Sequence, residues 1–128
     1  MSAAARQGLV FVVDDVEANR VLAQAYLRRI GWQVRCFPDA HSLLAALDDE
    51  VPQAMLIDVR MPELAGDELA ALLRRRPATA RLRLVGYTAH ALKDELAGFL
   101  AAGFDEVLIK PVLMADMQRA LPLQPATS

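Results

Sequence analysis

The sequence lacks several features that would place it in large classes of protein. Its 128 residues include one cysteine, so no disulfide can form within the chain, which fits a reducing cytoplasm. No stretch approaches the ~20 apolar residues of a transmembrane helix, and the N-terminal MSAAARQG has no apolar core of the kind found in signal peptides. The formal net charge of −2 argues against nucleic-acid binding, because no basic face could dominate the surface. These absences favour a soluble cytoplasmic domain, and 55% hydrophobic residues suffice for a core without disulfides or metal.

Two isolated features receive an ordinary structural interpretation. Arg74-Arg75-Arg76 is the only basic run. We predict that it is a solvated helix end favoured by the helix dipole, with a partner contact as the minor alternative. Cys36 lies in an apolar strand pattern and is predicted to be in or near the core rather than catalytic.

Apolar runs alternate with helical patterns along the whole of residues 8–121, whereas residues 1–7 and 122–128 have the composition of flexible ends or a linker. The predicted strands are 9–13, 32–37, a run ending at 58, 82–86 and 107–109, and the predicted helices are 17–30, 38–49, 65–76, 91–102 and 113–121. Strict alternation implies right-handed crossovers and an α/β doubly wound parallel sheet with helices on both faces. Periodicity alone does not fix the order of the strands.

Polar side chains stand where four of the predicted strands end. Asp14 and Asp15 follow the first strand, Asp58 ends the third, Thr88 follows the fourth and Lys110 follows the fifth. All carboxyl ends of a parallel sheet lie on one edge, where open α/β sheets bind ligands. Each residue also has an ordinary alternative as a helix cap, a turn residue or a surface lysine. Their occurrence at four strand ends favours a shared site.

Three acids in a small space repel one another unless a cation lies between them, and Mg²⁺ is the hard, oxygen-ligated ion that such a group suits. With Lys110 opposite them, the residues form an arrangement for accepting a phosphoryl group, which Asp58 would attack in line. A phosphohydrolase of the haloacid-dehalogenase type would need a second aspartate two residues after the nucleophile. Arg60 occupies that position, so we set this alternative aside.

Four motifs together resemble the receiver domain of two-component response regulators. They are VVDD at 12–15, IDVRMPELAG at 57–66, YTAHA at 87–91 and IKP at 109–111, and they match the family in order and spacing. The resemblance spans about residues 8–121. It implies a flavodoxin-like (βα)5 fold with strand order 2-1-3-4-5.

The resemblance implies a metal-assisted phosphoacceptor. Asp58 would accept the phosphoryl group. Asp15 and Asp58 would bind Mg²⁺ directly, Asp14 mostly through water, and the backbone carbonyl of Arg60 would complete the protein ligands.

The resemblance also assigns roles to the residues around the phosphoryl group. Thr88 would be the switch hydroxyl and Lys110 the lysine that pairs with the phosphate, before a Lys110-Pro111 bond that is usually cis in this family. Arg60 and His90, two residues beyond Asp58 and Thr88, occupy positions that tune the lifetime of the phosphoryl group. For each of them the alternative is an exposed side chain without that role.

Two departures from the family pattern concern the switch and the loop after Asp58. Val107 stands where an aromatic switch residue is usual, and Tyr87 is nearby but not at that position. A ring that swings inward at 107 therefore cannot report phosphorylation. Ala65-Gly66 replaces the usual Asp-Gly, so Gly66 keeps the permissive backbone while a local cap is lost.

The resulting hypothesis is a phosphorelay receiver that takes its phosphoryl group from a histidine kinase or a histidine phosphotransfer protein and acts on a protein partner or a fused kinase. The alternative is a pseudo-receiver that only binds proteins, for which the loss of the aromatic switch is the one argument. DDVEANR and YTAHAL look more like receivers of hybrid kinases. The residues after 121 are not expected to hold an output domain, so any output would act through partners or lie outside this sequence. The oligomeric state stays open, with a dimer through the fourth helix and fifth strand as one option. His41 is predicted to be a surface residue, since no histidine-kinase signature surrounds it.

Overall fold

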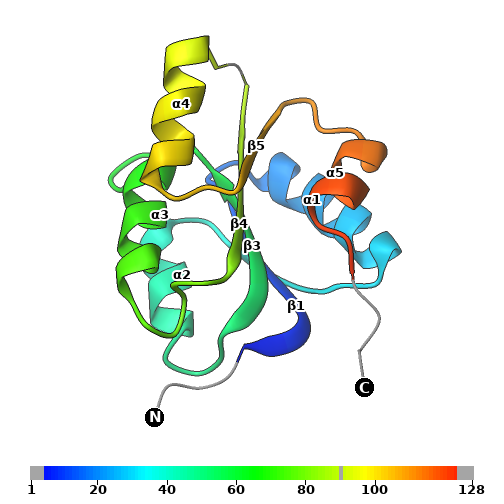
Figure 1. The fold of residues 1–128 in the computed structure, drawn as a ribbon. Helices are drawn as coiled ribbons and strands as arrows, with labels where there is room; N and C mark the ends of the chain where they lie inside the picture. The colour runs from blue at the N-terminus through cyan, green and yellow to red at the C-terminus, as the bar shows by residue number, and fades with distance from the viewer. Residues whose placement is uncertain (1–4, 90, 124–128) are drawn as a thin grey trace.

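A parallel β-sheet forms the centre of the computed structural model, which describes residues 5–89 and 91–123 (Figure 1). Within those residues, five strands lie in the order β2-β1-β3-β4-β5. The strands are β1 (Arg6–Val13), β2 (Gln33–Phe37), β3 (Pro52–Asp58), β4 (Arg83–Thr88) and β5 (Glu106–Ile109). The helices are α1 (Glu17–Ile30), α2 (Ala40–Ala46), α3 (Gly66–Arg75), α4 (Lys93–Ala102) and α5 (Met114–Ala120). The predicted fold class and strand order are confirmed.

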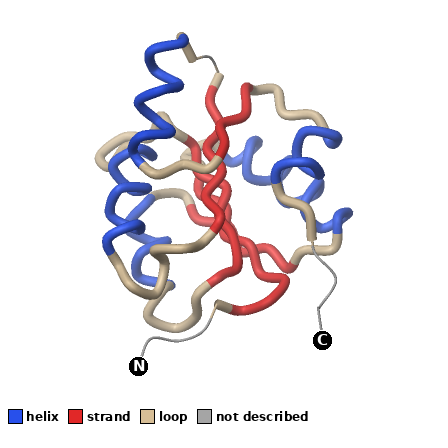
Figure 2. The backbone as a smooth tube through the Cα atoms, in the orientation of Figure 1, coloured by secondary structure: helices blue, strands red, loops and turns tan. Residues whose placement is uncertain are grey.

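The helices cover both faces of the sheet. Figure 1 shows α2, α3 and α4 on one side and α1 and α5 on the other, and the strands run between these layers in Figure 2. A hydrophobic core lies on each face of the sheet. β1 contributes residues to both cores, because alternate residues of a strand point to opposite faces. Phe11 and Val13 pack on the α2–α4 side, whereas Val10 and Val12 pack on the α1–α5 side. All four are completely buried, which explains why this central strand reads as a continuous apolar run.

Each of the five predicted strands and five predicted helices is present among the described residues, with shifted boundaries. β1 begins three residues before the predicted strand, and β4 continues two residues past the predicted end at Gly86. α2 ends at Ala46 instead of Asp49, because Asp48 and Asp49 bond back to carbonyls three residues earlier and so close a tight turn. β2 lies at the edge of the sheet, as its alternating sequence indicates.

The predicted helix at 17–30 is present as α1, and only a narrow part of it faces the sheet. The residues buried on α1 are Ala23 and Leu27, while Val21 and Leu22 are 58% and 45% exposed. Ala23 and Leu27 are four residues apart and face the sheet together, and the neighbouring apolar residues flank this narrow contact. The exposed apolar surface of α1 is therefore a consequence of how few of its positions touch the sheet.

The arginine run is only partly solvated, so that prediction was wrong for Arg74. Its guanidinium donates to the carbonyls of Ala80, Leu82 and Gly103 and pairs with Asp105 at 3.0 Å. It thereby satisfies backbone acceptors at the entry to β4 and the end of α4. Arg75 and Arg76 are exposed, as predicted.

Cys36, His41 and Trp32 lie outside the acidic edge of the sheet. Cys36 is half-buried and packs against the α1–α5 core, and the side chain of His41 is 68% exposed, as expected for both. Trp32 is buried, and its indole N–H donates to the carbonyl of Leu121 at 2.9 Å. Among the helices of residues 5–89 and 91–123, none is long and apolar enough to cross a bilayer.

Candidate functional site

The polar residues predicted at the strand ends meet at one edge of the sheet. β1 pairs with β3 so that Val13 lies opposite Ile57, which places Asp14 beside Asp58. β3 pairs with β4 so that Asp58 lies opposite Tyr87, and β4 pairs with β5 so that Thr88 lies opposite Ile109. The in-register parallel ladder therefore gathers the side chains that the sequence separates.

An acidic group forms the centre of this edge. Asp14, Asp15 and Asp58 each offer a carboxylate oxygen, and these oxygens lie within 4.8 Å of one another. Asp14 and Asp58 are buried while Asp15 is exposed, so the group opens to solvent on one side. Three oxygen donors with room for water fit a small hard cation such as Mg²⁺.

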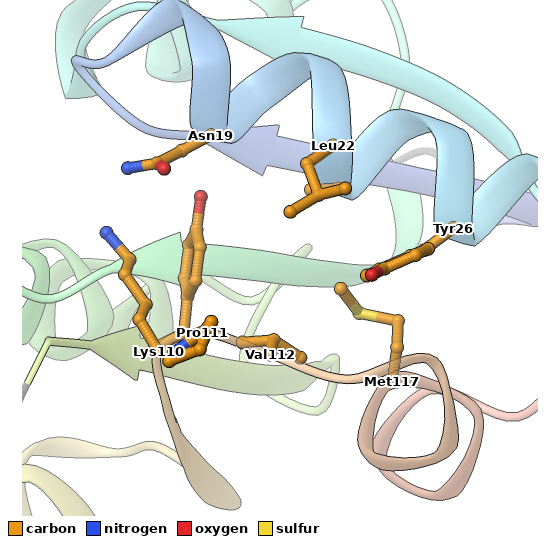
Figure 3. Close-up of a pocket in the computed structure, with 9 residues that line it drawn as sticks. Asn19, Leu22, Tyr26, Lys110, Pro111, Val112 and Met117 are labelled. Carbon is orange, nitrogen blue, oxygen red and sulfur yellow. The ribbon is translucent and has the colours of Figure 1, made fainter.

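Lys110 supplies the positive charge of the site. Its Nζ lies 3.3 Å from Oδ2 of Asp14 and 3.5 Å from Oδ1 of Asp58. The ammonium also lies 4.5 Å from the centre of the Tyr87 ring. Figure 3 shows Lys110 directed toward Asn19 of α1, at one end of a pocket of about 260 Å³ that α1 forms with the segment leading into α5. The Lys110-Pro111 peptide bond at the base of this side chain is cis.

Tyr87 is a member of the site that the sequence did not predict. Its hydroxyl donates to Oδ2 of Asp14 at 2.5 Å, while Oδ1 of Asp14 accepts the backbone N–H of Val16 at 2.8 Å. Burial, together with this bond to Asp14, raises the pKa of Tyr87 far above its ordinary value, so the phenol stays protonated and donates. The signal was the position of Tyr87 one residue before Thr88, which puts it on the same face as Asp58 in the neighbouring strand.

Asp58 holds its proton more tightly than an ordinary aspartate. Its pKa is raised from 3.8 to about 6, first by burial and then by the nearby charge of Asp14. Lys110 and the backbone N–H of Arg60, which donates to Oδ1 of Asp58 at 3.2 Å, act in the opposite direction. At neutral pH the carboxylate is ionised and poorly solvated, a suitable state for a nucleophile.

Replacing Asp58 with Asn should stabilise the metal-free protein at neutral pH. The folded state binds the Asp58 proton more tightly than the unfolded chain does. Protonated Asp58 therefore adds to the free energy of unfolding below about pH 4, and this added stability is lost as the pH rises to about 6. Asparagine cannot ionise, so the variant does not lose this stability. We expect its free energy of unfolding to exceed that of the wild type by about 1–3 kcal/mol at about pH 7.5, and the difference to shrink toward about pH 4. Urea unfolding at both pH values measures it, with exposed Asp49→Asn as the control. An equal difference at the two pH values would contradict the expectation.

Thr88 and Arg60, two of the residues predicted to surround the phosphoryl group, lie in different environments. Thr88 is completely buried at the end of β4. The side chain of Arg60 pairs with α4, because its Nη2 lies 2.5 Å from Oε2 of Glu95. Glu95 was also missed, because a contact 35 residues away leaves no local sequence signal. His90, predicted to tune the phosphoryl lifetime, lies outside the described residues.

Both departures from the family pattern, at Val107 and at Ala65-Gly66, have well-defined surroundings in the structure. Val107 is half-buried against the core on the α2–α4 side, and the ring in this region is that of buried Phe104, which lies against Gly86. Gly66 does not have a positive φ, so its role is space rather than conformational freedom. A Cβ at Gly66 would lie 2.4 Å from the backbone oxygen of Asp58. As expected without the usual aspartate, Ala65, the residue before the first residue of α3, provides no side-chain cap.

The strand order and the acidic edge define a receiver-type α/β domain, and the comparisons with known proteins agree. Residues 10–122 match the model of the response regulator receiver domain. The sequence is 35% identical to the sensor histidine kinase AruS of Pseudomonas aeruginosa over 114 residues, covering 88% of this chain and 11% of that kinase. This chain thus spans about a ninth of that relative.

Solved structures show the same fold. The receiver domain of a sensor histidine kinase from Pseudomonas aeruginosa PAO1, which has a magnesium ion in its active-site cleft, aligns with a TM-score of 0.80 and 27% identity over 89% of this chain and 93% of that one. Chemotaxis protein CheY4 of Vibrio cholerae aligns with a TM-score of 0.84 and 22% identity over 91% and 97%. The chain belongs to the response regulator receiver domain family of two-component systems.

Proposed function

We propose that this receiver accepts a phosphoryl group on Asp58 from a phosphohistidine of a partner protein. The observation that carries the proposal is the convergence on Asp58 of two further acids and an ammonium at 3.5 Å. A carboxylate that is buried yet ionised at neutral pH is a competent nucleophile, and the neighbouring charges suit the transfer of an anionic group.

The reaction exchanges one bond to phosphorus for another. A carboxylate oxygen of Asp58 attacks phosphorus in line, the phosphorus–nitrogen bond of the phosphohistidine breaks, and the imidazole nitrogen leaves with the electron pair. The product is an acyl phosphate on Asp58. Lys110, which lies between Asp14 and Asp58, is placed to pair with an oxygen of the phosphoryl group. Thr88, at the end of the next strand, is the proposed hydroxyl donor to the attached group.

The acidic group is the proposed Mg²⁺ site. Asp15 and Asp58 would bind the ion directly, Asp14 mostly through water, and the carbonyl of Arg60 would be the remaining protein ligand. When bound, the ion neutralises charge on the phosphoryl oxygens. The magnesium in the cleft of the related kinase receiver supports this assignment. Arg60 and His90 are proposed to set how long the acyl phosphate survives, Arg60 by pairing with it.

The proposed partners are a histidine kinase or histidine phosphotransfer protein as donor and a protein partner or fused kinase as target, in the cytoplasm. The similarity to AruS and to a kinase receiver supports a hybrid-kinase context. A dimer through α4 and β5 stays a prediction. Transfer of labelled phosphate from a phosphorylated histidine phosphotransfer protein to this chain, and its loss in Asp58→Asn, would test the donor class.

Incubation with acetyl phosphate and Mg²⁺ tests the phosphoacceptor itself. We expect an acid-labile mass gain of one phosphoryl group, lost in Asp58→Asn and on chelation of Mg²⁺. Intact-protein mass spectrometry measures it, and Asp49→Asn is the control because that exposed carboxylate lies in the turn after α2. No gain in the wild type would favour the interaction-only alternative. A gain that survives Asp58→Asn would contradict Asp58 as the phosphoacceptor.

A further inference from the structure

Helix α4 is held to the body of the protein by little buried surface. Among its residues, all of which the structure describes, only Phe99 is buried, whereas α3 buries Gly66, Leu69, Ala70 and Leu73. Nothing lies within 4 Å of a Cβ built on Gly98. Figure 1 shows α4 standing beyond α3 at the end of the molecule. A helix with so few apolar contacts opens locally at low cost in free energy.

An ion pair connects this helix to the phosphoacceptor. The backbone N–H of Arg60 donates to Oδ1 of Asp58, and its guanidinium pairs with Oε2 of Glu95 in the first turn of α4. The other oxygen of Glu95 accepts the backbone N–H of Leu92 at 3.1 Å and caps the helix. One arginine therefore touches the acid with its backbone and α4 with its side chain.

A phosphoryl group on Asp58 would compete with Glu95 for this guanidinium. A phosphoryl group carries nearly two negative charges and three acceptor oxygens, and arginine binds such groups with two parallel hydrogen bonds. Glu95 offers one charge, and the pair is partly solvated, with the Arg60 side chain 50% exposed. The two residues line a cavity of about 490 Å³ with Val59, Met61, Asp67 and Phe99, which leaves the guanidinium room to turn.

We propose that Glu95 is a positioning residue of this site: it holds Arg60 against α4 until the phosphoryl group on Asp58 withdraws the guanidinium, and the first turn of α4 loosens as a result. The inference rests on the proposed phosphorylation of Asp58. It supplies a route from Asp58 to the surface that needs no aromatic ring at Val107, because the signal is the loss of an ion pair rather than the movement of a ring.

Amide hydrogen exchange in segment 92–100, followed by mass spectrometry with and without acetyl phosphate and Mg²⁺, tests the proposal. In the wild type we expect phosphorylation to speed exchange about fivefold, because the loss of one solvated ion pair lowers the free energy of local opening by a corresponding amount. Glu95→Gln keeps an oxygen that can accept from Leu92 but lacks the charge. Without phosphorylation, segment 92–100 of this variant should exchange about fivefold faster than that of the wild type. Phosphorylation of the variant should then change its exchange rate less than about twofold. Arg60→Gln should behave in the same way.

The matched control is Glu50→Gln, which breaks the pairs with Arg6 and Arg35 at the other end of β1 and should leave segment 92–100 unchanged. The phosphoryl mass gain is read from the same samples. Without a gain in the wild type, the proposed phosphorylation fails, while the unphosphorylated comparison of Glu95→Gln with Glu50→Gln still tests the tether. A full gain with unchanged exchange, or a Glu95→Gln variant that behaves like the wild type, would overturn the role of Glu95.

Discussion

Replacing Lys110 with alanine should slow phosphorylation of Asp58 by acetyl phosphate about 100- to 1,000-fold, the usual loss when a preorganised donor to a transferring group is removed. Its Nζ lies 3.3 Å from Asp14 and 3.5 Å from Asp58, and the side chain is only 20% exposed. Without the ammonium, two buried acids face each other uncompensated. The pKa of Asp58, already raised by burial, loses the charge that opposes the rise. The carboxylate becomes scarcer near neutral pH, and the incoming phosphoryl group loses its cation.

The rate of the mass gain at saturating acetyl phosphate and Mg²⁺ measures this loss. Lys93→Ala is a close control, because Lys93 is the other lysine of the sequence and is exposed at the start of α4. Urea unfolding of Lys110→Ala establishes that the variant is folded. A Lys110→Ala rate within about threefold of wild type would contradict a role for the ammonium in the transfer.

Replacing Gly66 with alanine should destabilise the protein by about 2–4 kcal/mol, a large effect for one methyl group. The new Cβ would lie 2.4 Å from the backbone oxygen of Asp58 and 2.7 Å from Cα of Val59. Both contacts are with backbone, so no side chain can turn away and the loop after β3 must move. That movement would shift Asp58 relative to Asp14 and Lys110, and the rate of phosphorylation should fall as well.

Gly98→Ala is the matched control for Gly66→Ala. Gly98 lies within α4 with open space around its Cβ position, so alanine should stabilise the protein by about 0.5–1 kcal/mol. Urea unfolding of both variants gives the two values. Equal and small effects at the two positions would contradict the close approach at Gly66.

The sequence predicts the elements and the chemistry of the edge well because both depend on local signals. Apolar runs that end in Asp14, Asp58 or Lys110 mark buried parallel strands and place these residues together once the strands are aligned. The contacts of Tyr87 and Glu95 join segments that are distant in the sequence. The position of Tyr87 before Thr88 places it near the acidic edge but does not reveal its bond to Asp14, and no local pattern reveals the pairing of Glu95. The hydrogen bonds from Arg74 to carbonyls of two other loops have the same origin.

The sequence does not show which residues of α1 are buried against the sheet, for a related reason. Its apolar residues satisfy a helical repeat over more of the circumference than the sheet covers, so the sequence alone cannot select Ala23 and Leu27 over Val21 and Leu22. The role of Gly66 was likewise assigned to conformational freedom, whereas the structure requires it for the absence of a side chain. In both cases the deciding information is the distance to a neighbouring segment.

The position of Trp32 gives the protein an optical reporter that is separate from its chemistry. It is the one tryptophan of the sequence, it lies just before the edge strand β2, and its indole N–H is bonded to Leu121 after α5. Its fluorescence should follow the seating of the C-terminal helix on the sheet and stay insensitive to cation binding at the acidic edge. Emission spectra can therefore monitor unfolding in every variant considered above without interference from Mg²⁺ or phosphodonor.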